Sequence, residues 1–130
     1  MKVSKKAITS PKAKAIGPYS AAVEIGDLVF VSGQIPLDSA TGKLVEGDIS
    51  AQTKQSLENL KTILSAAGLT FAHVVKTTIF LTSMGDFAAV NEVYKAHVAE
   101  PYPARSTIAV AALPMGAKVE IEMIAARSAA

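Results

Sequence analysis

Residues 48–82 read DISAQTKQSLENLKTILSAAGLTFAHVVKTTIFLT and predict a helix followed by a strand. Apolar residues recur at helical spacing in the first part of this stretch, so we expect a helix that begins at Asp48 or Ser50 and ends before Gly68. The β-branched and aromatic run from Val74 to Thr82 predicts a strand. The side of the helix expected to face solvent carries Gln52, Lys54, Gln55, Glu58 and Lys61.

A β-hairpin is predicted upstream of this helix. Two β-prone runs, Ala21–Ile25 and Leu28–Ser32, flank a short turn at Gly26-Asp27. The glycine- and proline-containing stretch 33–47 is typical of a loop. Ala7–Thr9 is a candidate for a short extra strand.

A second helix and two more strands are predicted downstream. Ser83 followed by Asp86 indicates a capping box at the start of the helix, and the prolines after residue 100 indicate its end. The runs Ser106–Val110 and Lys118–Ala126 predict the last strands. The order ββαβαββ therefore predicts a single α/β (α+β) domain over residues 1–130, with two helices on one face of a mixed sheet.

The other face of such a sheet is predicted to be apolar and uncovered. It would carry Leu28, Phe30 and one alternating set of side chains from the strand 74–82. Because an exposed apolar face of this extent favours a partner, we expect an oligomer whose sheets pack face to face.

Composition excludes several classes of protein and site. The 130-residue chain has no cysteine, which excludes disulfides, thiolate catalysis and zinc–cysteine sites, and its two histidines do not have the spacing of metal ligands. No apolar run approaches the roughly 20 residues of a membrane span. Five lysines lie in the first 14 residues, but the net charge is only +2, so we interpret them as a solvated arm rather than an RNA contact. No apolar stretch follows them, as a secretory signal would require, and we expect a mature, cytoplasmic chain.

Two residues near the C-terminus are the strongest candidates for chemistry. Arg105 opens a predicted strand, and its planar guanidinium suits two-point capture of a carboxylate. Glu120 lies among apolar residues of the next strand, where partial burial would raise its pKa and suit it to proton transfer. The alternative is a structural ion pair between the two across neighbouring strands. Period-two alternation puts Glu122 on the same face as Glu120, and the residues alone leave open which of them acts.

Two further segments could approach a ligand. In Ile16-Gly-Pro-Tyr-Ser20, the Gly-Pro turn would aim Tyr19. In Val31-Ser-Gly-Gln-Ile-Pro36, Gly33 would let the backbone approach a ligand closely. Taken singly, these segments also fit an ordinary turn tyrosine and a strand-ending glycine.

Taken together, these stretches resemble the RidA (YjgF) family of reactive-intermediate deaminases over about residues 16–127. The matching motifs occur in the family's order and at nearly its spacing. They are Ile16-Gly-Pro-Tyr19, Ser32-Gly-Gln-Ile-Pro36, Gln55-Ser-Leu-Glu-Asn-Leu60, Val75-Lys-Thr-Thr78, Asp86-Phe87 with Val90-Asn91 and Tyr94, Pro103-Ala-Arg105, and Val119-Glu-Ile-Glu122.

The resemblance implies a fold, an assembly and an activity. The subunit would be chorismate-mutase-like, and three copies would form a homotrimer with sites in the clefts between subunits. The reaction would be hydrolysis of 2-aminoacrylate, 2-iminopropanoate and related 2-imino acids to 2-keto acids and ammonia, without a metal or organic cofactor.

The resemblance also assigns roles to residues of this chain. Arg105 would bind the substrate carboxylate, Glu120 would orient water or handle the proton, and Tyr19 would complete the catalytic set. Thr107 stands where several bacterial members have cysteine, which removes thiol-dependent behaviour there. The expected substrate-binding residues are Ser32, Gly33, Asn91 and Thr107.

Two other functions compete with the deaminase. One is an endoribonuclease acting on single-stranded RNA, which would call for a general acid, a general base and phosphate-binding cations. The other is a non-catalytic module that binds 2-keto acids through Arg105.

Overall fold

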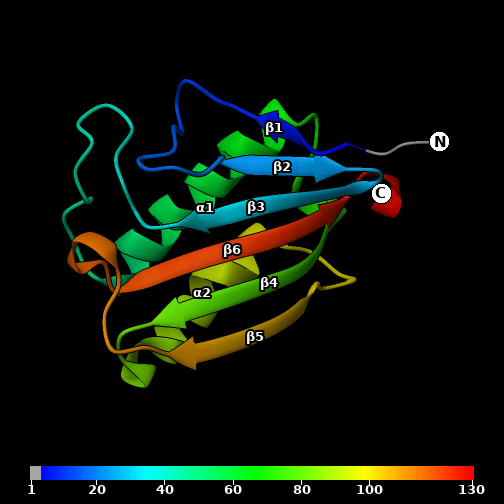
Figure 1. Ribbon diagram of the computed structural model, residues 1–130. Helices are drawn as coiled ribbons and strands as arrows, with labels where there is room; N and C mark the ends of the chain where they lie inside the picture. The colour runs from blue at the N-terminus through cyan, green and yellow to red at the C-terminus, as the bar shows by residue number, and fades with distance from the viewer. Residues whose placement is uncertain (1–3) are drawn as a thin grey trace.

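The structure is a computed structural model that describes residues 4–130. Six strands form one sheet in the order β1-β2-β3-β6-β4-β5, accompanied by two α-helices (Figure 1). The elements are β1 Lys6–Ile8, β2 Ala22–Ile25, β3 Leu28–Gln34, α1 Ile49–Ala66, β4 Val74–Leu81, α2 Phe87–His97, β5 Ala104–Ala109 and β6 Val119–Ala126. These elements confirm the predicted mixed sheet, including the short extra strand. Lys2, counted above with the lysine cluster, lies outside the described residues.

The sheet is antiparallel except at one edge. β4 and β5 run parallel, whereas β6 pairs antiparallel with both β3 and β4. The pairing of β3 with β6 shifts register between Val31 and Gln34, so β3 contains a bulge at Ser32-Gly33. The β2–β3 hairpin turns at Gly26, whose φ of 57° is a conformation that glycine adopts without steric cost.

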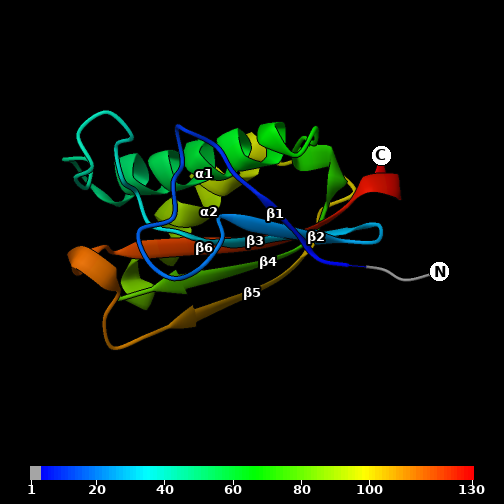
Figure 2. The ribbon, with the colours of Figure 1, turned by 45° about the horizontal axis from the view of Figure 1, so that its top comes forward.

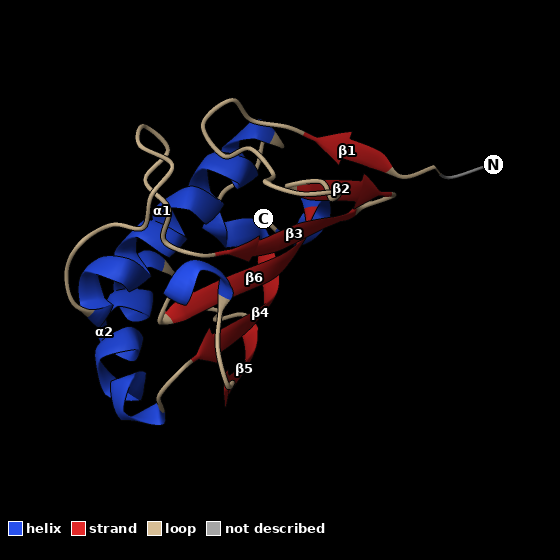
Figure 3. Ribbon diagram, turned by 60° about the vertical axis from the view of Figure 1, so that its left-hand side comes forward, coloured by secondary structure: helices blue, strands red, loops and turns tan. Residues whose placement is uncertain are grey.

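Both helices lie on the same face of the sheet (Figures 2 and 3). Asp48 caps α1 by accepting a hydrogen bond from the backbone N–H of Ala51 at 3.0 Å. The apolar stripe of α1 then packs against β3 and β6, and α1 also contacts α2. The fully buried side chains of that stripe are Leu57, Leu60, Ile63 and Leu64.

Two predictions about the helices are wrong. Ser83 and Asp86 do not form a capping box for α2, because Ser83 instead caps the short 3-10 turn Met84–Asp86. Asp86 precedes α2 without making a side-chain cap. Gln52 was expected to face solvent, but it is 7% exposed, because its side-chain oxygen accepts a hydrogen bond from the backbone N–H of Lys118.

The face opposite the helices is uncovered and carries exposed apolar side chains, as predicted. Leu28 and Phe30 of β3 are 39% and 43% exposed, and Ile108 of β5 is 46% exposed. Lys76 and Glu122 lie on the same face, since each pairs with a residue that points away from the helices. Neither helix of the described chain is long and apolar enough to span a membrane.

Candidate functional site

Glu120 and the backbone of Gly33 are in direct contact. A methyl group added to Gly33 would lie only 2.9 Å from Cδ of Glu120, so the Glu120 side chain occupies the space beside this glycine. Tyr19, Pro114 and Ile16 line the same cavity, whose volume is about 60 Å³. The structure thus brings together three of the predicted site residues, Tyr19, Gly33 and Glu120.

The β3 bulge and the segment that carries Tyr19 are joined by hydrogen bonds. The hydroxyl of Ser32 donates to the carbonyl of Ser20 at 2.6 Å, and the Ser32 N–H donates to the carbonyl of Ala21 at 2.9 Å. The Tyr19 hydroxyl accepts from the N–H of Ile16 at 3.3 Å, which folds the ring back over its own turn. Ser32 therefore holds the tyrosine segment against the end of β3.

The pKa of Glu120 is raised above its ordinary value of 4.5. Burial is the larger cause, because it disfavours the charged carboxylate, and the negative charge of Glu122 adds to the shift. The two glutamates lie on one face of β6, as the alternation of the strand predicts. A carboxyl group with a raised pKa in a small cavity takes up a proton more readily than an exposed carboxylate, which suits it to proton transfer.

Arg105 lies in a second pocket, at the edge of the sheet next to α2. Its guanidinium carbon is 5.0 Å from the ring centre of Tyr94 and 5.7 Å from that of Phe87, distances typical of cation–π contacts. Tyr94 is fixed in turn by a 2.9 Å hydrogen bond to Thr77 of β4. Asn91 lines this pocket, which has a volume of about 380 Å³.

The two pockets lie on opposite faces of the sheet. Arg105 pairs with Thr77, whose side chain is buried under α2, so Arg105 points to the helix side. Glu120 pairs with Phe80, which lies between the helix-facing residues Ile79 and Leu81 and therefore points to the uncovered face. A single chain consequently presents two separate pockets, one at Arg105 and one at Glu120.

The predicted alternative of an Arg105–Glu120 ion pair is wrong. The strands that carry the two residues are not neighbours, because β4 lies between β5 and β6. In residues 4–130 the ion pairs are His97–Glu58 and Arg127–Glu24.

Thr107 is the remaining predicted site residue. It pairs with Ile79, on the same face of β5 as Arg105, and its buried hydroxyl oxygen has no hydrogen-bond partner in the described chain. A buried hydroxyl without a partner is destabilising, and Thr107 lines neither the Glu120 cavity nor the Arg105 pocket.

The histidines take no part in either pocket. His73 closes a capping box with Thr70, and His97 lies between α1 and α2. Among residues 4–130, no three His, Asp or Glu side chains gather in an arrangement that could hold a metal ion.

Sequence reasoning missed several lining residues. Pro114 and Lys14 line the Glu120 cavity, and Tyr94 and Tyr102 line the Arg105 pocket. Tyr94 occurs above in one of the family motifs, without a role at the site. Its position one helical turn after Asn91 was the available signal that both could face one pocket.

The family model, the related sequences and the solved structures that match this chain point to one protein family. The family model described as Endoribonuclease L-PSP matches residues 9–127. Protein DfrA of Myxococcus xanthus is 56% identical over 127 residues, which are 95% of this chain and 97% of that protein. A Salmonella typhimurium protein named 2-iminobutanoate/2-iminopropanoate deaminase is 49% identical, with 96% of this chain and 99% of that protein covered. The crystal structure of E. coli TdcF with bound serine has a TM-score of 0.88 at 46% identity, covering 95% and 99% of the two chains.

The raised pKa of Glu120 predicts how stability depends on pH. The folded state binds the Glu120 proton more tightly than the unfolded state, so this group favours folding most below pH 4.5, and its contribution is lost as the pH rises through the raised pKa. Glutamine does not titrate, so Glu120→Gln abolishes this pH-dependent loss of stability. We expect the free energy of unfolding of the variant to increase relative to that of the parent protein as the pH rises from 4.5 through the raised pKa, as measured by urea unfolding at several pH values.

Glu24→Gln is the matched control, because Glu24 accepts an ion-paired hydrogen bond from Arg127 at 3.2 Å. It should be less stable than the parent at pH 7. A loss of stability in Glu120→Gln as large as that of Glu24→Gln would mean that Glu120 has a stabilising partner.

Proposed function

Because the chain belongs to the RidA (YjgF) family, we propose that it is a deaminase that hydrolyses 2-aminoacrylate, 2-iminopropanoate and related 2-imino acids to 2-keto acids and ammonia. The observation that carries the proposal is the Glu120 carboxyl group, which has a raised pKa and is held against the Gly33 backbone in a small cavity. The serine bound to TdcF is a small 2-amino acid, the class of molecule from which such imines derive.

The chemistry follows from the substrate. A 2-imino acid carries a carboxylate next to the electrophilic carbon of its C=N bond. Arg105 would bind the carboxylate through two parallel hydrogen bonds, with its guanidinium plane held by the rings of Tyr94 and Phe87. Fixing the carboxylate also fixes the carbon that water attacks, so positioning supplies much of the rate.

Glu120 would manage the proton. As water adds to the C=N carbon, the carboxylate takes a proton from it and gives a proton to the nitrogen, which leaves a carbinolamine. The carboxylate then takes the hydroxyl proton and passes it to the amine nitrogen, so that the C–N bond breaks, ammonia leaves and the carbonyl forms. A raised pKa suits this exchange, because the group must be both a competent base and a competent acid near neutral pH. Tyr19 and the Gly33 N–H would line the pocket around the reacting atoms.

Arg105 and Glu120 lie on opposite faces of one sheet, so one chain alone does not bring them to one substrate. We therefore propose a homotrimer in which the Arg105 half-site of one copy meets the Glu120 half-site of the next. The uncovered apolar face supports association, since Leu28, Phe30 and Ile108 would be buried by a neighbouring sheet.

The competing functions are less well supported. For an endoribonuclease, the name of the family model is the argument in favour, but neither pocket contains a histidine and the only guanidinium in them is Arg105. A 2-keto acid sensor would use the same Arg105 pocket and differs from the enzyme only in lacking turnover. We place the deaminase in the cytoplasm, where pyridoxal-dependent dehydratases acting on serine or threonine would supply the imines.

Hydrolysis of dehydratase-generated 2-iminopropanoate tests the proposal directly. The protein should accelerate loss of the imine, and Glu120→Gln should reduce that rate by about two orders of magnitude or more, because it removes acid–base assistance. Binding of pyruvate, followed by calorimetry, should survive in the variant, because Arg105 still holds the carboxylate. Pyruvate binding without imine turnover in the parent protein would favour the sensor, and unchanged hydrolysis in the variant would shift the role to Glu122 or backbone groups.

Arg105→Lys should lose most of the activity and keep the fold. Lysine retains the charge but lacks the planar two-point contact and the stacking on Tyr94, so we expect a loss of about 2–4 kcal/mol in transition-state binding, measured from kcat/KM. Arg127→Lys is the control, because Arg127 binds Glu24 and the carbonyl of Ala67 away from both pockets. It should lower the melting temperature with little change in kcat/KM, and near-parental turnover in Arg105→Lys would make Arg105 structural.

Light scattering tests the trimer. The mass should be about three times that of the 13.5 kDa chain at micromolar concentration. Phe30→Lys should dissociate the assembly, because it places a charge on the apolar face. Met84→Lys should not, because Met84 is similarly exposed (46% against 43%) but lies in the turn before α2. A single-chain mass for the parent protein would contradict both the trimer and the shared site.

A further inference from the structure

Three polar side chains of α1 are buried at one side of the helix. Gln52, Ser56 and Asn59 are 7%, 0% and 8% exposed, and their spacing of four and three residues aligns them along one face. This face points toward the end of β3 and the segment before β6. Polar groups are buried in proteins only where they meet hydrogen-bond partners, so their partners indicate what they do.

Two of the three bind the backbone that follows the β3 bulge. The hydroxyl of Ser56 donates to the carbonyl of Gln34. The side-chain amide of Asn59 donates to the carbonyl of Leu37 at 2.9 Å and to that of Ile35 at 3.3 Å. The first of these carbonyls belongs to the residue after Gly33. The helix therefore fixes the backbone that directly follows the contact between Gly33 and Glu120.

The third binds the segment that leads into β6, the strand that carries Glu120. The side-chain oxygen of Gln52 accepts a hydrogen bond from the backbone N–H of Lys118 at 3.0 Å, two residues before Glu120. One helix therefore holds both segments whose contact forms the Glu120 half-site, and it does so through side chains rather than through apolar packing alone.

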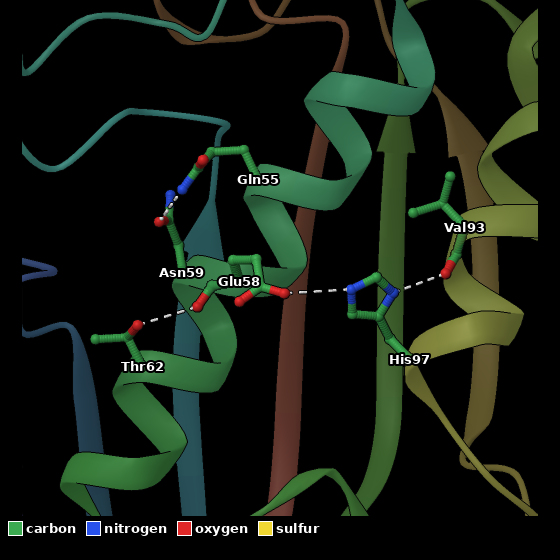
Figure 4. A network of polar contacts seen from close by, with 6 residues as sticks. All are labelled: Gln55, Glu58, Asn59, Thr62, Val93 and His97. Carbon is green, nitrogen blue, oxygen red and sulfur yellow. Dashed lines mark hydrogen bonds and ion pairs between the residues drawn. The ribbon is translucent and has the colours of Figure 1, made fainter.

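The Asn59 amide is itself oriented by a neighbour. Gln55 donates from Nε2 to Oδ1 of Asn59 at 2.8 Å (Figure 4). With Oδ1 occupied in this way, the NH₂ group of Asn59 faces the two carbonyls of the loop. The bond from Gln55 thus fixes which atoms of the Asn59 amide donate and which accept.

We propose that Gln52, Ser56 and Asn59 are positioning residues that set the contact between the Gly33 backbone and the Glu120 carboxyl group. The effect of this positioning on catalysis rests on the proposed function. The gap at Gly33 is too narrow for a methyl group, so a small shift of either segment changes how closely Glu120 is enclosed. Displacements of about 1 Å at a reacting group can reduce rates by about 100-fold.

Ser56→Ala and Asn59→Leu test the proposal, and Thr53→Val is their matched control. Thr53 is 0% exposed on the same helix, but its hydroxyl donates its hydrogen bond to the carbonyl of Ile49 in that helix and not to either segment. We expect kcat for imine hydrolysis to fall roughly 10- to 100-fold in Ser56→Ala and Asn59→Leu, with KM changed less than about twofold. Thr53→Val should keep the parental kcat even if its melting temperature falls.

A second readout separates this inference from the proposed function. The pKa of the Glu120 carboxyl group, followed by ¹³C NMR, should move down toward 4.5 in Ser56→Ala and Asn59→Leu, because a loosened loop admits water to the cavity. It should stay in place in Thr53→Val. Glu122, Lys14 and Tyr19 are the titratable groups around Glu120, and none of them is altered in these variants.

The outcomes are distinct. Absence of imine hydrolysis in the parent protein would reject the proposed function, while the NMR pKa would still decide whether the α1 residues position Glu120. Parental kcat together with a parental Glu120 pKa in Ser56→Ala would reject the positioning role, even if stability falls. If Asn59→Leu does not fold, Ser56→Ala decides alone, because it removes a single oxygen atom.

Discussion

β6 joins the two halves of the molecule by pairing with β3 on one side and β4 on the other. Without it, the hairpin half of β1, β2 and β3 and the parallel pair of β4 and β5 would be separate and incomplete sheets. Its inward residues, Val119, Ile121, Met123 and Ala125, are also at the centre of the core under the helices. Glu120, on the other face of the same strand, takes its position from these pairings.

The two helices position the residues of both pockets. α1 binds the ends of β3 and the approach to β6, whereas α2 supplies the aromatic rings under Arg105. The two helices are tied together by His97, whose Nδ1 lies 2.8 Å from the carbonyl of Val93 and whose Nε2 lies 3.5 Å from Glu58 (Figure 4). Phe71 packs edge-on against the same imidazole. The environment of Arg105 and that of Glu120 are therefore linked through the packing of α1 on α2.

Local patterns in the sequence were enough to predict the elements but not their neighbours. The hairpin, both helices and every strand follow from residue periodicity and turn residues, which act over a few positions. Strand order depends on pairings between residues far apart in the chain, and so Arg105 and Glu120 were placed on adjacent strands when β4 separates them. The sequence pattern places Gln52 on the solvent side because amides usually face water. In the structure, the Gln52 side chain is buried instead, because it accepts the hydrogen bond of the Lys118 N–H, which needs an acceptor there. The family resemblance supplies the candidate site residues, and the strand register shows that Arg105 and Glu120 divide between two faces of the sheet.

The central place of β6 also governs the order of events during synthesis. The ribosome makes β6 after both of its partners, so β3 and β4 emerge first with unpaired edges facing each other across an empty position. The helices can form while β6 is still absent, because their hydrogen bonds are local. The sheet closes only when β6 inserts between its partners, and until then the nascent chain exposes strand edges and apolar surface of the kind that chaperones bind. The Glu120 pocket can form only at this last stage of folding, because Glu120 lies on β6 itself.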